Sequence, residues 1–202
     1  MDFYVGDIQN YDWYEKRLLS FDSYNILSDN SNVVIIGDSI SSAIPSNEFS
    51  SEFSIYNFAI SGDTTDSLLK RIDKIPFEKF DFVVFMIGVN DLGRGSSISK
   101  TFKNYKNILE KIRFYKCKVI VQPIVFTTRF KRDNIKIQKL NNLIKNFSEQ
   151  EGITYFDVNS YLSTGNELNS EFTIDGMHLN NSAYNIWIGN LNELLLNTEN
   201  KL

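Results

Sequence analysis

The chain contains one histidine, and the residue types around it could carry out acyl transfer. His178 lies in the segment Thr173-Ile174-Asp175-Gly176-Met177-His178. A serine hydroxyl is a weak nucleophile near neutral pH, and an imidazole, with an ordinary pKa of about 6.5, is best suited to take its proton. Asp175 precedes His178 by one short turn, which Gly176 allows. Asp175 could therefore orient the same ring from within one loop, as the base of a serine hydrolase requires.

A candidate nucleophile follows the first strongly apolar segment of the chain. Val33-Val34-Ile35-Ile36 is β-branched throughout, which is typical of a strand buried on both faces of a parallel sheet. Gly37 then lets the backbone turn sharply and present Asp38 and Ser39. Open α/β sheets bind ligands at the carboxyl ends of their strands, so Ser39 lies where a nucleophile is expected. A lone Gly-x-Ser often occurs by chance, and it gains weight only from its partners.

Two further segments could stabilise the oxyanion that forms during ester hydrolysis. Each preorganised donor of this kind is typically worth about 3–4 kcal/mol of the barrier. Gly62, which has no side chain, lets its backbone N–H approach a substrate, and Asn90 offers a side-chain amide. The backbone N–H of Ser39 is a third candidate donor. Each segment also has a structural alternative, a plain turn for Gly62 and a cap or Asx-turn for Asn90.

The elements that would position these residues alternate between strands and helices. Apolar runs predict strands at 33–36, 54–58, 82–87, 118–124 and 153–158. Apolar residues at intervals of three and four predict helices at 11–21, 65–75, 102–115, 137–147 and 183–195. This alternation predicts a single domain, residues 1–202, in which a parallel sheet lies between two layers of helices. Right-handed crossovers bring every strand's carboxyl end to one edge, so Ser39, Gly62 and Asn90 are expected to converge there with the loop after the fifth strand.

The composition fits a globular protein and argues against several classes of partner. It is 42% hydrophobic and 23% charged, with a formal net charge of -4. That acidity disfavours nucleic acid or an anionic membrane as a partner, and no apolar run approaches the ~20 residues of a membrane span. Residues 1–12 lack a basic region followed by an apolar core, so we expect no signal peptide. With a single cysteine, Cys117, the chain is expected in the cytoplasm.

The sequence predicts neither a cofactor nor a metal. One histidine and one cysteine cannot make a typical zinc set. No Gly-x-x-x-x-Gly-Lys-[Ser/Thr] loop occurs, and Gly93-Arg94-Gly95-Ser96 does not continue as a dinucleotide fingerprint. The segment Gly37-Asp38-Ser39-Ile40-Ser41 also lacks the second glycine of the α/β-hydrolase elbow, which disfavours that fold.

Four segments, in order, resemble the signature blocks of the SGNH, or GDSL-type, hydrolases. They are Gly37-Asp38-Ser39, Gly62 within 57–65, Gly88-Val89-Asn90-Asp91 and Asp175-Gly176-Met177-His178. The resemblance covers nearly the whole chain and looks closest to the bacterial branch similar to platelet-activating-factor acetylhydrolase. It implies a flavodoxin-like sheet of five parallel strands. It further implies that Ser39 is the nucleophile, His178 the base and Asp175 its orienting carboxylate. By the same resemblance, Gly62 and Asn90 join the Ser39 N–H in the oxyanion hole.

The activity expected from this resemblance is hydrolysis of a short-chain ester, an acetyl group on a carbohydrate, through an acyl-enzyme. No segment is typical of a long acyl tunnel or a mobile lid, which favours a small acyl group. The basic segment 127–132 follows the fourth strand, and Arg129 within it is a candidate partner for an acidic sugar, with a solvated loop as the alternative. The family also includes lysophospholipases and thioesterases, which stay open. A non-catalytic carbohydrate-binding protein on the same fold is the alternative from another class.

Overall fold

A five-stranded parallel sheet forms the middle layer of the structure, a computed structural model that describes residues 12–24, 26, 30–129 and 133–199. Its strands are β1 (Ser31–Gly37), β2 (Phe53–Asn57), β3 (Phe82–Met86), β4 (Lys118–Val121) and β5 (Thr154–Tyr155). Their spatial order is β2-β1-β3-β4-β5, which is the flavodoxin-like order with a switch point between β1 and β3. The predicted fold class, a three-layer α/β/α arrangement, is confirmed.

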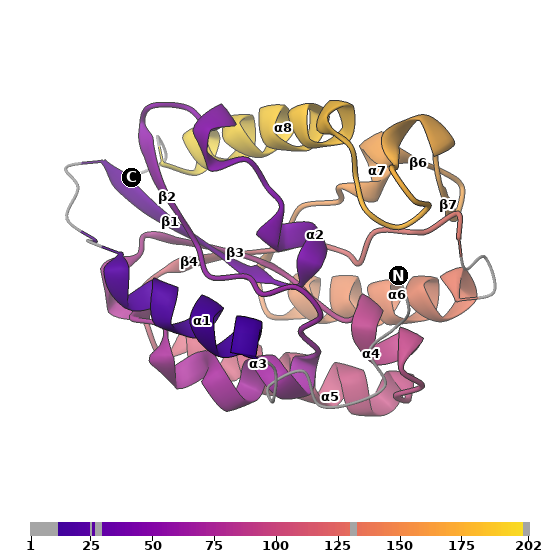
Figure 1. Ribbon diagram of the computed structural model, residues 1–202, viewed down its shortest axis with the longest axis horizontal. Helices are drawn as coiled ribbons and strands as arrows, with labels where there is room; N and C mark the ends of the chain where they lie inside the picture. The colour runs from indigo at the N-terminus through magenta and orange to yellow at the C-terminus, as the bar shows by residue number, and fades with distance from the viewer. Residues whose placement is uncertain (1–11, 25, 27–29, 130–132, 200–202) are drawn as a thin grey trace.

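Helices cover both faces of this sheet (Figure 1). On one face lie α3 (Thr65–Arg71), α5 (Ile98–Arg113) and α6 (Asn134–Gln150). The Tyr14 hydroxyl of α1 (Asp12–Ser20) bonds Asp63, just before α3. The long helix α8 (Asn181–Glu199) covers the other face. The shorter elements are α2 (Ser39–Ser42), α4 (Val89–Gly93), α7 (Asn159–Leu162) and the hairpin β6 (Ser163–Thr164) and β7 (Glu167–Leu168). In the described ranges, no helix is both long and apolar enough to cross a membrane.

The centre of the sheet is held by apolar burial on both faces. Val33, Val34, Ile35 and Ile36 are fully buried, as the continuous β-branched run predicts. β1 pairs with β2 and β3 at once, and Gly37 lies opposite Met86 at the ends of their strands. The loops that follow β1 and β3 therefore leave the same edge side by side. That edge receives the candidate site.

Two predicted strands are shorter in the structure, each for a different reason. The strand predicted at 118–124 ends at Val121, and the amide of Asn141 on α6 then bonds both the N–H and the carbonyl of Ile124, at 2.8 Å each. The strand predicted at 153–158 keeps only Thr154–Tyr155, since the chain at this sheet edge turns into α7. The segment after it, predicted as irregular, contains α7 and the small hairpin.

The second predicted helix is also shorter than its apolar pattern. α3 ends at Arg71 and continues as a tight 3-10 turn, Ile72–Lys74, ahead of Pro76. Proline disfavours helical backbone in the residue before it, so the regular helix ends early.

Candidate active site

Ser39 lies at the first position of α2, directly beyond the end of β1. Gly37 makes this turn possible, since a Cβ there would lie 2.2 Å from the Met86 carbonyl oxygen. Asp38 caps the helix, and its carboxylate accepts the Ile40 N–H at 3.0 Å. The first N–H groups of a helix have no partner within it, so the backbone N–H of Ser39 lies where it can donate to a ligand.

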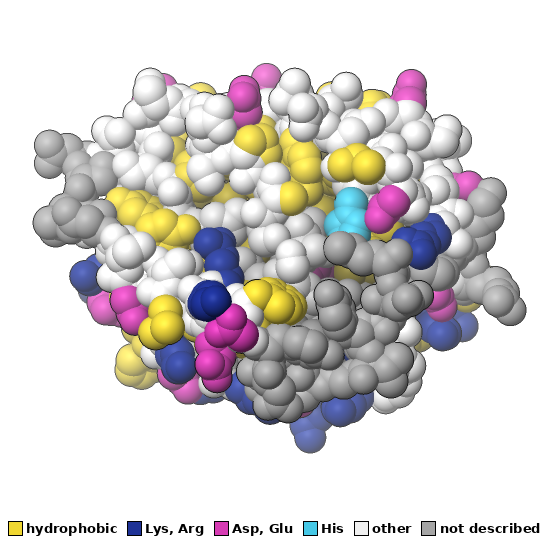
Figure 2. Space-filling model, viewed as in Figure 1, with side chains coloured by type: hydrophobic (Ala, Val, Ile, Leu, Met, Phe, Trp, Pro, Cys, Tyr) yellow, Lys and Arg dark blue, Asp and Glu magenta, His cyan; other side chains and the backbone are white. Residues whose placement is uncertain are grey.

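The structure brings the three predicted catalytic side chains together. Nε2 of His178 lies 3.1 Å from Oγ of Ser39, and Nδ1 of the same ring lies 2.9 Å from Oδ2 of Asp175. Both are ordinary hydrogen-bond distances. Figure 2 shows the histidine, the one cyan side chain, at the molecular surface beside an acidic side chain. A hydroxyl, an imidazole and a carboxylate in this order can transfer a proton away from the serine.

The loop that carries His178 is anchored to the segment after β4. The carbonyl of Gly176 accepts the N–H groups of Thr128 at 2.8 Å and Arg129 at 3.1 Å, together with the hydroxyl of Thr127. Gly176 has a φ of +87°, and a Cβ there would lie 2.7 Å from Oγ1 of Thr128. Only glycine fits this close approach. The sequence suggested the turn at Gly176 but gave no sign that Thr127 and Thr128 hold it.

Hydrogen bonds keep the Asp175 carboxylate ionised. Burial raises its pKa, but the opposing hydrogen bonds from the His178 N–H, the His178 ring and the Met177 N–H outweigh it and lower the pKa to about 2. Nη1 of Arg129 also lies 4.0 Å from Oδ2 of Asp175, with both side chains about a third exposed. A charged carboxylate here fixes the ring orientation and stabilises the imidazolium form.

The predicted oxyanion donors lie in two loops that contact each other. Gly62 has a φ of +79° in the turn after β2, and Asn90 is buried in α4 after β3. Nδ2 of Asn90 donates to the carbonyl of Asp63 at 2.9 Å. An amide nitrogen carries two hydrogens, so the second can still donate to a ligand. The turn that contains Gly62 also contacts α2, the helix that begins at Ser39, since the Oγ atoms of Ser42 and Ser61 lie 3.3 Å apart.

The sequence profile of the GDSL-like lipase/acylhydrolase family matches residues 35–186, which span every residue of the candidate site. The chain belongs to this family. The description of the family, lipase or acylhydrolase, agrees with the ester hydrolysis that the four sequence segments predicted.

The chain is similar in sequence to a longer protein and in fold to several solved structures. The N-acylneuraminate cytidylyltransferase of Streptococcus agalactiae serotype V is 29% identical over 153 residues, which are 74% of this chain and 35% of that protein. The chain thus spans about a third of the relative's length. A GDSL-like lipase from Bacteroides thetaiotaomicron has a TM-score of 0.78 at 21% identity, over 95% of this chain and 100% of that one. A Streptococcus pneumonia protein, provisionally described as a platelet activating factor, has a TM-score of 0.79 at 24% identity, over 90% and 92%.

Beneath the site, this GDSL-like hydrolase buries three carboxylates that sequence reasoning did not single out as a group. Burial, with a contribution from Asp63 and Asp91, raises the pKa of Asp38 to about 7 against the opposing Ile40 N–H. Asp63 is fully buried and bonds Nε and Nη2 of Arg71, at 2.8 and 2.6 Å, and the Tyr14 hydroxyl at 2.9 Å. Carboxylates and arginines are usually exposed, so nothing local in the sequence marked these as buried.

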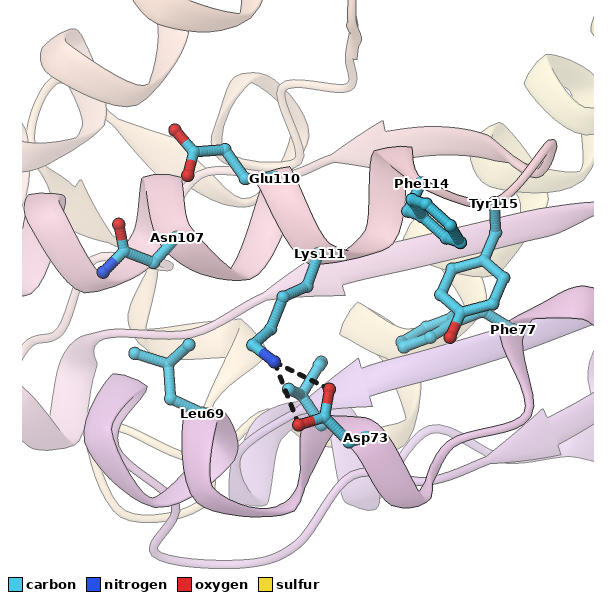
Figure 3. A pocket seen from close by; sticks show the side chains of 9 residues that line it. Leu69, Asp73, Phe77, Asn107, Glu110, Lys111, Phe114 and Tyr115 are labelled. Atoms are coloured by element: carbon cyan, nitrogen blue, oxygen red, sulfur yellow. Dashed lines mark hydrogen bonds and ion pairs between the residues drawn. The ribbon is translucent and has the colours of Figure 1, made fainter.

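Two further features are a pocket away from the chemistry and the basic segment at the rim of the site. A 580 Å³ pocket between α3 and α5 is crossed by an ion pair of Lys111 with Asp73 (Figure 3). Some of the residues that line it directly precede β3 and β4 in the chain. The pocket therefore lies at the amino ends of these strands, at the edge of the sheet opposite to Ser39. Of the basic segment 127–132, residues 130–132 lie outside the described residues, and Arg129 lies at the rim of the site beside Asp175.

Proposed function

We propose that the chain is a serine esterase that removes a short acyl group, an acetyl group, from a carbohydrate. The observation that carries this proposal is the hydrogen-bonded path from Ser39 Oγ through the His178 ring to Asp175, at 3.1 and 2.9 Å. Those distances allow proton transfer without rearrangement of the loop. We further propose that the chain acts as a single domain in the cytoplasm.

In the first half of the reaction, Ser39 Oγ attacks the ester carbonyl carbon while His178 Nε2 takes its proton. The oxyanion of the tetrahedral intermediate accepts hydrogen bonds from the Gly62 N–H, the Asn90 amide and the Ser39 N–H. His178 then gives the proton to the alcohol oxygen as the C–O bond breaks. The products of this half are the free alcohol and an acyl-enzyme on Ser39.

In the second half, a water molecule attacks the acyl-enzyme while His178 takes one of its protons. The same donors stabilise the second oxyanion. When the bond to Ser39 breaks, His178 returns the proton to Oγ and the acid leaves. Asp175 stays ionised throughout, since its pKa of about 2 lies far below neutral pH.

For the alcohol, we propose an acidic sugar of the N-acylneuraminate class. The Streptococcus agalactiae relative is named for a reaction on such a sugar. A neuraminate carries a carboxylate, and arginine recognises carboxylates through paired, charge-assisted hydrogen bonds. Arg129 supports this proposal because its guanidinium lies at the rim, near Asp175, with about a third of its side chain exposed. A lysophospholipase, a thioesterase and a non-catalytic carbohydrate-binding protein are the competing proposals.

The first experiment measures hydrolysis of p-nitrophenyl esters from acetyl to decanoyl by the wild-type protein and by Ser39→Ala. A preference for acetyl that disappears in the variant supports a serine acetylesterase. A preference for long acyl chains would replace that proposal with a lysophospholipase or a thioesterase. Absence of any turnover that depends on Ser39, on these esters and on O-acetylated sugars, would favour the binding protein.

The second experiment tests the acidic sugar through Arg129→Gln. We expect this variant to raise KM for an O-acetylated N-acylneuraminate by about tenfold to a hundredfold, since hydrogen bonds to charged groups contribute about 1.5–3 kcal/mol. Turnover of p-nitrophenyl acetate, which has no carboxylate, should fall much less, since the Arg129–Asp175 ion pair spans 4.0 Å and is partly exposed. Arg113→Gln, at an exposed ion pair with Glu151, is the matched control. Equal effects of Arg129→Gln on both substrates would contradict a carboxylate contact.

A further inference from the structure

Arg94 joins the two loops that carry the proposed oxyanion donors. Nη2 of its guanidinium donates to the carbonyl of Gly62 at 2.9 Å. Its backbone N–H donates to the carbonyl of Asn90 at 3.0 Å, at the end of α4. The backbone bond closes the last turn of α4 itself, whereas the guanidinium reaches the turn after β2. The Arg94 side chain thus ties the short helix that carries Asn90 to the Gly62 carbonyl.

The contact with Gly62 matters because glycine, which has no side chain, can adopt the widest range of backbone angles. Asp63 donates its N–H to the Ile60 carbonyl at 3.1 Å, which closes a four-residue turn with Gly62 in third place. The φ of +79° is typical of that position in a type II turn. Glycine tolerates many other backbone angles, so the direction of its N–H depends on what holds the neighbouring peptides. The Gly62–Asp63 peptide is held at both ends, by Arg94 at its oxygen and by Ile60 at its nitrogen.

The second donor, Asn90, is attached to the same turn as Gly62. The side-chain amide of Asn90 bonds the Asp63 carbonyl at 2.9 Å, while the Asn90 carbonyl accepts the Arg94 N–H. α4 is only Val89–Gly93, and a helix this short has little stability of its own. Its position is therefore set by side-chain bonds to other segments, from Asn90 Nδ2 to the Asp63 carbonyl and from Arg94 Nη2 to the Gly62 carbonyl. A shift of α4 would move the Asn90 amide relative to Gly62.

Arg94 is itself constrained, unlike an arginine at the open surface. Its side chain is half-buried, and among the residues that the structure describes its enclosed Nε has no hydrogen-bond partner. The buried carboxylate of Asp91 lies near enough that the positive charge of Arg94 opposes the rise that burial causes in the Asp91 pKa. Packing and the buried charge of Asp91 restrict the guanidinium to one position, so its hydrogen bond can hold the Gly62 carbonyl in place.

We propose that Arg94 is a positioning residue of the oxyanion hole, which fixes the Gly62 peptide and the Asn90 helix in one geometry. This inference rests on the proposed function, because it requires that Gly62 and Asn90 bind the oxyanion. Arg94 takes no part in proton transfer and does not touch the substrate. Its effect belongs to the transition state, where donors displaced by about 1 Å can cost a hundredfold in rate.

The test compares Arg94→Met with wild type on p-nitrophenyl acetate, with separate values of kcat and KM. We expect kcat to fall by about tenfold to a hundredfold, below the cost of removing a donor outright, while KM stays near its wild-type value. Affinity for an alkylboronic acid, which forms a tetrahedral anionic adduct with an activated serine, should weaken by a similar factor. Arg113→Met, which loses an exposed arginine of α5, should leave all three quantities unchanged.

Other outcomes separate the positioning role from the proposed function. Unchanged kcat in Arg94→Met, or a raised KM with unchanged kcat, overturns the positioning role even when Ser39→Ala abolishes turnover. Full activity of Ser39→Ala overturns the proposed function, whatever Arg94 does. If Arg94→Met does not fold, kcat and KM of Arg94→Lys test the positioning role in the same way. Lysine keeps the charge beside Asp91 but replaces the planar guanidinium with a point charge, so the same kcat-specific loss is expected.

Discussion

The chemistry of Asp38 is strongly altered by its surroundings. It precedes Ser39, is 1% exposed, and lies near the buried carboxylates of Asp63 and Asp91. Burial, and then these two charges, raise its pKa from 3.8 to about 7. The folded state therefore favours the neutral form of Asp38. A carboxyl group with such a pKa makes stability depend on pH in the direction opposite to an ion-paired aspartate.

The corresponding prediction concerns Asp38→Asn. In wild type, the Asp38 contribution is fully present below about pH 4, where both folded and unfolded states hold the proton. It is lost as pH rises through about 7, at a cost of roughly 4 kcal/mol for a shift of about three pKa units. Asparagine keeps an oxygen for the Ile40 N–H but cannot ionise. Urea unfolding from pH 4 to 8 should show wild type losing stability relative to the variant, and parallel curves would contradict the shift.

The loop between Thr173 and His178 shows how an element is built to hold one side chain. Thr173 Oγ1 accepts the Gly176 N–H and donates to the His178 carbonyl, each at 2.8 Å. The Gly176 carbonyl in turn docks on the segment after β4. His178 is thus fixed from both sides of the turn. The close packing at Gly176 makes this loop sensitive to a single methyl group.

Gly176→Ala and Gly165→Ala form a matched pair that isolates this packing. Both glycines have positive φ, +87° and +60°, so either substitution should cost about 1–2 kcal/mol of stability. A Cβ at Gly176 would meet Thr128 Oγ1 at 2.7 Å, whereas one at Gly165 would meet nothing within 4 Å. Turnover of p-nitrophenyl acetate should fall by about tenfold or more in Gly176→Ala and stay near wild type in Gly165→Ala. Equal turnover in the two variants would mean that this packing does not position His178.

At the scale of the whole molecule, the features that depend on apolar periodicity and strand order could be predicted from the sequence. The buried run 33–36 and the alternation of strands with helices predicted the parallel sheet, and right-handed crossovers predicted that Ser39, Gly62 and Asn90 leave one edge. Contacts among buried polar residues were not predictable in this way. Tyr14 bonds Asp63 across 49 positions and Asn90 bonds the Asp63 carbonyl across 27, and no local pattern encodes such pairs.

The same limit applies to the elements that came out shorter than predicted. The apolar run predicted one strand over 118–124, but only the fold shows that the Asn141 amide bonds Ile124 in place of a neighbouring strand. Arg94 lies in the segment 93–96, whose glycines do not continue as a dinucleotide fingerprint. Its contacts with Gly62 and Asn90 became visible only when the loops after β2 and β3 were placed together.

We expect Ser39, activated by His178, to form the acyl-enzyme. The measurement that tests it most directly is the rate of p-nitrophenyl acetate hydrolysis by Ser39→Ala, beside Ser42→Ala, which removes another hydroxyl from the same short helix. The proposed mechanism predicts a loss of about 10⁴-fold or more for Ser39→Ala, since removing the nucleophile of a comparable triad costs about 2 × 10⁶ in kcat. Ser42→Ala should keep most of its activity. A Ser39→Ala protein that hydrolyses the ester at the wild-type rate would contradict this expectation.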